Sequence, residues 1–144
     1  MSIFEGGDNA QILGGKYPKL FQFPGAHDLE VVQVNSGTSF KGEYFGVVLE
    51  VKSSTNPALL PGRKLQFGKV KDNRYPQYFF SDIKKTLGAI LGQDPEAIKQ
   101  QHMEACCTDK QPCKGKRVHC DVYDRESKEP GGKKNRVTDF SPAA

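Results

Sequence analysis

The sequence predicts a mainly β (α+β) fold: a small five-stranded barrel with a helical insert between the third and fourth strands and a loop-rich amino-terminal arm. Three observations support this prediction. Apolar and polar residues alternate in separate short segments, the pattern changes once to helical spacing, and the first 28 residues are rich in glycine and proline. The chain of 144 residues, 36% of them hydrophobic, suits one domain with one modest core.

Residues 1–28 form the predicted arm, because their glycines, prolines and scattered aromatic residues favour irregular structure. Residues 29–144 form the predicted folded domain. Its first strand covers Leu29–Asn35, which is rich in β-branched residues and ends at the turn-like cluster Ser36–Ser39.

The second strand has the clearest pattern. Within Glu43–Ser53, Val47, Leu49 and Val51 fall on one face, because side chains alternate along a strand. A loop rich in serine and proline follows, and Lys64–Val70 then alternates as a third strand.

The helical insert is predicted from a change of period. Apolar residues recur at helical spacing, which places one set on a buried face: Phe80, Ile83, Leu87, Ile90 and Leu91. Gly92 is suited to end this helix in a left-handed conformation. Asp94-Pro95-Glu96 provides a cap and a first turn, so a second short helix is expected to reach about Cys106.

Two strands complete the domain. Val118, Cys120 and Val122 alternate with polar residues, and the turn 129–133 leads into a last strand over Asn135–Phe140. The order of three strands, helices and two strands is that of a five-stranded OB-type barrel, which is partly open and carries its helix between strands 3 and 4.

Several segments resemble a known family: Gly42–Pro57, Pro61–Gly62, Ile83–Gly88, Gly115–Val118 and Asn135–Pro142. Across residues 31–142 the chain resembles the phage-encoded OB-fold single-stranded DNA-binding protein family. The resemblance implies sequence-tolerant binding to strands exposed during phage DNA replication or recombination, in the host cytoplasm, without enzyme activity. The chain contains no tryptophan, so base stacking falls to phenylalanine and tyrosine.

The charge distribution agrees with a polyanionic partner. The net charge is +4, but residues 1–60 sum to −2 and residues 61–144 to +6. Single-strand binding combines cations that follow phosphates with aromatic faces that stack on bases. The candidate residues are Lys41, Tyr44, Phe45, Lys52, Arg63, Lys64, Phe67, Lys69, Lys71, Arg74, Tyr75, Tyr78, Tyr123, Arg125, Lys133, Lys134 and Arg136.

Each group of candidates also has a plain structural interpretation. Phe67 shares strand parity with Leu65 and so suits the core, and Tyr123 has the parity of a solvated surface residue. The cations around the turn 129–133 form either a flexible loop that closes over a strand or an ordinary charged hairpin tip.

Other chemistries are less well supported. Cys106, Cys107, Cys113 and Cys120 lie near two histidines but lack the paired spacing of a zinc site, so no metal or other cofactor is expected. The histidines fall in no catalytic motif, and a metal-dependent nuclease is the weakest alternative.

The stronger alternative is a small barrel that binds another protein through its basic hairpin. Single-stranded DNA is the expected partner, while RNA, a second copy of the chain, and replication or recombination proteins stay open. No apolar run is long enough to span a bilayer, and the acidic start is no signal peptide, so a cytoplasmic protein is expected without a membrane partner.

Overall fold

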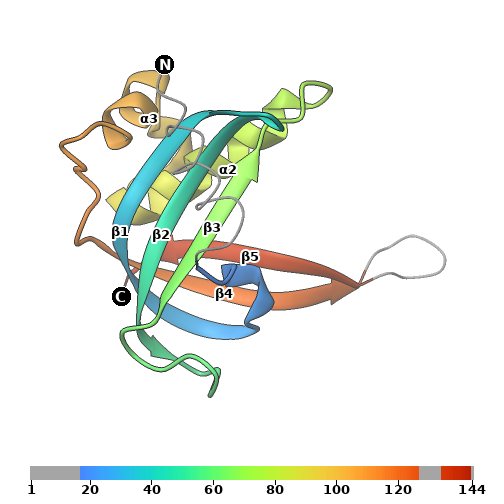
Figure 1. Cartoon of the computed structure of the whole chain (residues 1–144), viewed down its shortest axis with the longest axis vertical. Helices are drawn as coiled ribbons and strands as arrows, with labels where there is room; N and C mark the ends of the chain where they lie inside the picture. Colours follow the sequence, from blue (N-terminus) through green and yellow to red (C-terminus); the bar gives the residue numbers. More distant parts are fainter. Residues whose placement is uncertain (1–16, 127–133, 144) are drawn as a thin grey trace.

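The computed structural model describes residues 17–126 and 134–143, and within them five strands form one antiparallel sheet. The order across the sheet is β3-β2-β1-β4-β5 (Figure 1). The strands are β1 (Gly25–Ser39), β2 (Gly42–Ser54), β3 (Lys64–Val70), β4 (Arg117–Glu126) and β5 (Lys134–Pro142).

The sheet bends around its long central strand. β1 pairs with β2 over nearly its whole length, but it pairs with β4 only from Gly25 to Glu30. The β1–β2 register shifts between Val31 and Gln33, as expected for a β-bulge, which increases the local twist. In Figure 1 the β4–β5 hairpin accordingly crosses β1–β3 at a steep angle. The result is a small, open, β-barrel-like α+β fold.

The helix α2 (Pro76–Leu91) lies behind the sheet in Figure 1 and ends at Gly92, whose φ of 66° is left-handed as predicted. Its buried face includes Phe79, Ile83, Leu87 and Ile90. Phe80 was expected on this face but is exposed. Phe79 is buried in its place, because it lies four residues before Ile83 on the same face.

The second predicted helix is interrupted. Asp94 accepts a hydrogen bond from the Glu96 amide at 2.9 Å and caps the short 3-10 helix η2 (Pro95–Ala97). Ile98 then adopts an extended conformation, with its side chain fully buried in the core. The chain becomes helical again in α3 (Gln100–Cys106), so burial of Ile98 overrides the helical pattern.

The predicted arm is more ordered near its end than glycine and proline content suggests. η1 (Leu20–Gln22) is a 3-10 helix, and β1 begins at Gly25 instead of Leu29. His27 is fully buried there: its Nε2–H donates to the Phe23 carbonyl at 2.7 Å, and its Nδ1 accepts from Ser54 Oγ at 2.6 Å. Residues 1–16 and the turn 129–133 lie outside the described residues.

The segment from Pro18 to Phe23 lies between the two edge strands of the sheet. The backbone N–H of Gln66 in β3 donates to the Pro18 carbonyl at 2.9 Å. The guanidinium of Arg136 in β5 donates to the Phe21 carbonyl at 2.8 Å. Leu20 is completely buried in the core between these contacts. This segment therefore joins edges that are not paired with each other in the described sheet. None of the described helices is long and apolar enough to cross a membrane.

Candidate nucleic-acid interface

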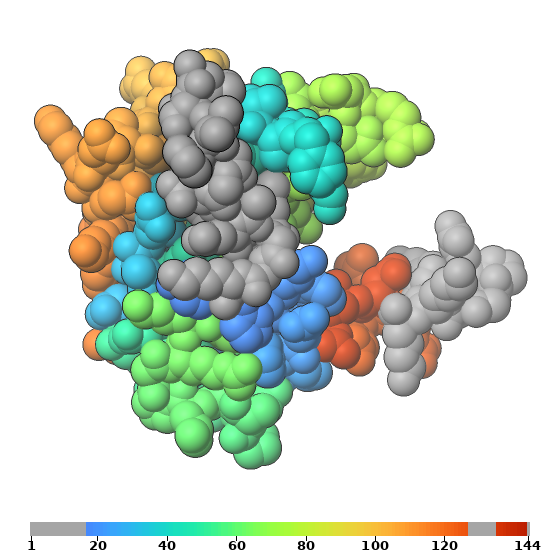
Figure 2. Space-filling view, in the orientation of Figure 1, coloured from blue at the N-terminus to red at the C-terminus, as the bar shows by residue number. Residues whose placement is uncertain are grey.

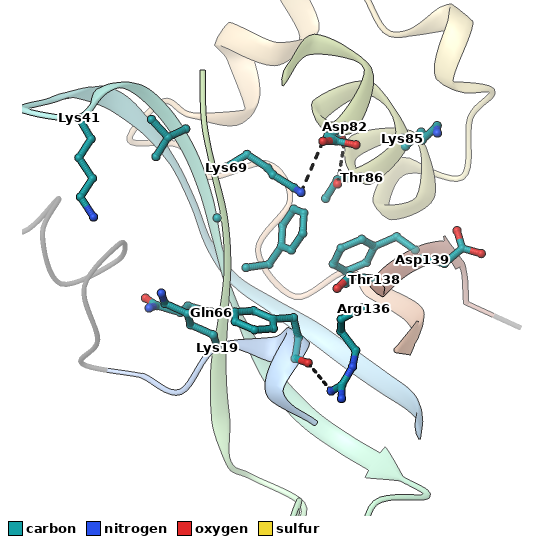
Figure 3. A pocket seen from close by; sticks show the side chains of 15 residues that line it. Lys19, Lys41, Gln66, Lys69, Asp82, Lys85, Thr86, Arg136, Thr138 and Asp139 are labelled. Atoms are coloured by element: carbon teal, nitrogen blue, oxygen red, sulfur yellow. Dashed lines mark hydrogen bonds and ion pairs between the residues drawn. The ribbon is translucent and has the colours of Figure 1, made fainter. Parts of the chain in front are cut away.

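A groove of about 370 Å³ runs beside β3, between that strand, β5 and the middle of α2 (Figure 3). Its lining combines cations with aromatic rings, against two carboxylates, Asp82 and Asp139. We call it the cationic groove and define it by Lys19, Lys41, Lys69, Lys85, Arg136, Phe21, Phe67 and Phe140. A polyanion would meet a net positive surface here.

The cations of the groove differ in how far they are already neutralised. Lys69 lies 3.6 Å from Asp82 of α2, and both groups are substantially exposed. Arg136 pairs with Asp124 across the β4–β5 hairpin. Within the described residues no ion pair is found for Lys19, Lys41 or Lys85. These three lysines are therefore the ones whose charge is open to a phosphate.

A cluster of exposed rings adjoins the groove at the β1–β2 turn, in the loop after β3 and in the first turns of α2. Phe40 is 92% exposed and Tyr78 65% exposed, and the Tyr75 and Tyr78 ring centroids lie 6.0 Å apart. The two loops meet where the Lys71 amide donates to the Glu43 carbonyl at 2.7 Å. Figure 2 shows the cyan turn directly beside the yellow-green loop. We call the rings of Phe40, Tyr75, Tyr78 and Phe80 the aromatic rim.

Cationic side chains accompany the rings of the rim. The Lys41 ammonium lies 5.7 Å from the Phe40 ring centroid, and the Lys71 ammonium 5.3 Å from that of Phe80. The Arg74 guanidinium lies over the Tyr75 ring. It also donates hydrogen bonds to both carboxylate oxygens of Asp72, which lowers the pKa of Asp72. The rim thus offers flat apolar surface with positive charge at hand, the combination that single-strand binding uses.

Two predicted stacking residues are excluded by burial. Tyr44 is 1% exposed and Phe45 2% exposed. Phe45 packs in the core, and the Tyr44 ring covers Gly37 of the neighbouring strand so closely that a Cβ there would lie 2.8 Å from its hydroxyl. Burial also raises the pKa of Tyr44. As candidates for base stacking both were wrong, because β2 is central in the sheet and both its faces are covered.

Phe67 is a core residue, as its shared strand parity with Leu65 indicated. Its ring is buried in the core and contacts Phe140 of β5 edge-on. Only its margin lines the groove. It is therefore part of the wall of the groove and not an open stacking face.

Three other predicted cations lie outside the groove. Lys52 pairs with Glu50 and lies 3.6 Å from Glu30, which raises the pKa of Lys52 and lowers that of Glu50. Lys64 of β3 lies opposite Glu50 of β2, and Arg63 donates to the Ala58 carbonyl at 3.0 Å. These side chains belong to a mixed-charge surface at the other end of β3.

The candidates on the β4–β5 hairpin also differ in whether they line the groove. Tyr123 and Arg125 are exposed on β4 but do not line the groove. Arg136 lines it, yet its guanidinium is held by Asp124 and the Phe21 carbonyl. Lys133 and the Lys134 side chain lie outside the described residues.

Several groove and rim residues were not among the sequence candidates: Lys19, Phe21, Phe40, Gln66 and Lys85. Phe40 carried a usable signal, because an aromatic residue in a two-residue hairpin turn has little chance of burial. Lys19 and Phe21 were not identified from the sequence, because they belong to the segment that was assigned to an irregular arm.

Cys106 ends α3, Cys107 follows it directly, Cys113 lies in the loop before β4, and Cys120 lies in β4 itself. Cys106 Sγ and Cys113 Sγ lie 3.4 Å apart, and the thiol of Cys113 donates to Cys106, which lowers the pKa of Cys106 to about 7. Cys120 is buried in β4, where desolvation raises its pKa. Across residues 17–126 and 134–143, no three histidine, cysteine or acidic side chains converge as metal ligands.

One further polar cluster lies on the β1–β4 surface. His119 bonds Asp28 at 3.0 Å and Asp121 at 2.9 Å, and these bonds raise the pKa of His119. Ser53 Oγ donates to Asp28 at 2.9 Å. Both imidazole nitrogens are engaged by carboxylates, so the ring has no nitrogen left to activate a nucleophile.

Comparison with known proteins adds no relative to this picture. No protein-family model matches the chain, and no curated protein sequence matches it significantly.

Proposed function

We propose that this protein binds single-stranded DNA, with little dependence on sequence, through the cationic groove and aromatic rim of an OB-type barrel. The strand order β3-β2-β1-β4-β5 supports the barrel assignment, as does the helix between β3 and β4. The Phe67–Phe140 contact brings the edge strands β3 and β5 together, as closure of such a barrel requires.

The observation that carries the proposal is the position of unpaired lysines next to exposed rings along one edge of the sheet. Lys41 belongs to both surfaces, since it lines the groove and lies over the Phe40 ring. A strand whose phosphates follow Lys19, Lys41 and Lys85 would present its bases to neighbouring aromatic side chains.

A single strand suits this surface better than a duplex. Stacking on Phe40, Tyr75 or Tyr78 needs an open base face, and a duplex keeps its base faces stacked inside. Duplex readers place a helix or ribbon in the major groove with base-contacting side chains. The rings of the rim instead offer contact that any unpaired base can use, which favours sequence tolerance.

The biological setting follows from the same proposal. A sequence-tolerant binder would coat strands exposed in phage DNA replication or recombination, in the cytoplasm of the host cell. RNA binding, self-association and contacts with replication or recombination proteins are further parts of the proposal that separate measurements decide.

A charge-removal experiment tests the site. Lys19, Lys41 and Lys85 are changed together to glutamine, and the matched control changes Lys110, Lys114 and Lys116, three exposed lysines of the loop between α3 and β4. Because each phosphate contact adds about −0.7 to the log-log salt slope, the groove variant should lose about 2 units of slope. The control should lose none.

The same titrations separate the rival functions. Equal slopes for the two triple variants would place phosphate contacts elsewhere and reject the groove. Affinity for a protein partner with a flat salt response would support the protein-binding barrel. Metal-dependent cleavage of the labelled strand would support the nuclease.

A further inference from the structure

Gln66 is a buried amide that the described fold leaves without a partner. Its side chain is 2% exposed, and neither Nε2 nor Oε1 has a hydrogen-bond partner. Buried polar groups are nearly always paired, so an unpaired carboxamide needs an explanation. Its neighbour in register, Val48, is apolar and leaves both polar atoms unsatisfied.

The amide lies in the wall of the cationic groove. Figure 3 shows the Gln66 and Lys19 side chains on the same side of β3 as Lys41, with Lys69 and Arg136 on the other side. Two glycines, Gly46 and Gly68, oppose each other next in register on the face that Gln66 shares. Gly68 lines the groove and is exposed, so its missing side chain leaves room for a flat ligand near the backbone, whereas Gly46 is buried.

We propose that Gln66 reads the edge of one base of the bound strand, and that this base is adenine. The inference rests on the proposed single-strand binding. A carboxamide offers one donor and one acceptor side by side, which match the N7 acceptor and N6 donor of adenine. Lys19 and Lys41 at the rim of the groove hold the flanking phosphates.

Lys19 is the neighbour of this subsite, because its backbone forms a bridge with that of Gln66. Its side chain is drawn beside the carboxamide in Figure 3 and belongs to an exposed residue. Entry of a base requires this side chain to turn towards a phosphate, a movement that needs no change in the β3 backbone. Binding thereby satisfies the amide that the free protein leaves unpaired.

The test compares the protein with Gln66→Leu, which keeps the approximate shape and removes both polar atoms. Each protein is titrated with an oligo-dT strand and with strands carrying one central dA, dC or dG. The unaltered protein should bind the dA strand about tenfold tighter than oligo-dT, because one bidentate contact gives about that discrimination. Gln66→Leu should bind all four strands alike and keep the salt slope on oligo-dT.

Stability gives a second readout. Since the amide has no partner to lose, Gln66→Leu should melt at the same temperature as the unaltered protein or higher. A large fall in melting temperature would show that the amide is satisfied in the fold, which would overturn the inference.

The outcomes distinguish this inference from the proposed function. Failure of the unaltered protein to bind any strand would reject single-strand binding itself. Binding without an adenine preference, a preference for another base, or an adenine preference that survives in Gln66→Leu would reject the role of Gln66 and leave single-strand binding standing.

Discussion

The rings of Phe67 and Phe140 meet edge-to-face, with centroids 4.9 Å apart and planes at 76°. Phe67 belongs to β3 and Phe140 to β5, the two outermost strands of the sheet. Since these strands are the two ends of the strand order, this contact brings the two edges of the curved sheet together. It also forms one wall of the cationic groove.

Loss of this contact should destabilise the fold. We expect Phe67→Ala to lower the free energy of unfolding by about 3 to 5 kcal/mol, the usual range for removing a buried phenylalanine. A double-mutant cycle with Phe140→Ala should give a coupling of about 0.5 to 1.5 kcal/mol. Urea unfolding measures both. A coupling of zero would show that the ring contact contributes nothing beyond separate burial.

The aromatic rim should contribute to binding and not to folding. Tyr75→Ala and Tyr78→Ala should each weaken single-strand binding by about 1 to 3 kcal/mol if the ring stacks on a base, with little change in melting temperature. Tyr123→Ala is the matched control, because Tyr123 is similarly exposed but lies on β4 and does not belong to the aromatic rim. An equal loss of affinity in all three variants would place stacking on the hairpin as well.

Arg136 should contribute to stability, a role that neither interpretation of the charged hairpin included. Its guanidinium donates to the Phe21 carbonyl and pairs with Asp124, so Arg136→Gln should lower the free energy of unfolding by about 1 kcal/mol. Arg125→Gln, an exposed neighbour on β4, should cost close to nothing. Thermal unfolding compares the two. Equal melting temperatures would show that the bond to Phe21 does not hold the amino-terminal segment.

His119 should give the fold a specific pH dependence. Hydrogen bonds that His119 donates to Asp28 and Asp121 raise the pKa of His119, so its stabilisation is complete below the unfolded pKa and disappears as pH rises through the higher folded pKa. Asp28 has a lowered pKa, and its contribution is lost only when the pH falls through that value. The cluster therefore stabilises most in mildly acid solution.

Substitution of the imidazole measures this effect. The melting temperature of His119→Asn should lie furthest below that of the unaltered protein at about pH 5 to 6, and the difference should shrink towards about pH 8. A difference that stays constant over this range would show that the charge of His119 does not matter. Ser53→Ala, which removes only a bond to Asp28, serves as the control for altered packing.

The strands and the main helix were predictable because their patterns are local. Val47, Leu49 and Val51 are buried on the face that alternation indicated, and Gly92 ends the helix as expected. The interruption at Ile98 was not predictable from capping signals, because it depends on what the core needs at that point. Strand β1 extends past its predicted ends because it pairs with β2 beyond the β-branched run.

The site was harder to predict than the fold. The positions of Lys41 and Lys69 follow from turn and strand assignments, but Tyr44 and Phe45 failed because alternation does not show that both faces of β2 are covered. Lys19 and Phe21 join the groove through contacts with β3 and β5, strands that lie far away in sequence. Such long-range placement leaves no local signal.

The central claim is tested most directly by competition between single-stranded and duplex DNA for the unaltered protein. A fluorescent oligo-dT strand is titrated with protein at several salt concentrations, and unlabelled single strand, duplex or RNA of equal length is added as competitor. We expect single-stranded DNA to compete far better than duplex, and the affinity for the labelled strand to fall steeply as salt rises. Equal competition by duplex, or an affinity that does not respond to salt, would contradict it.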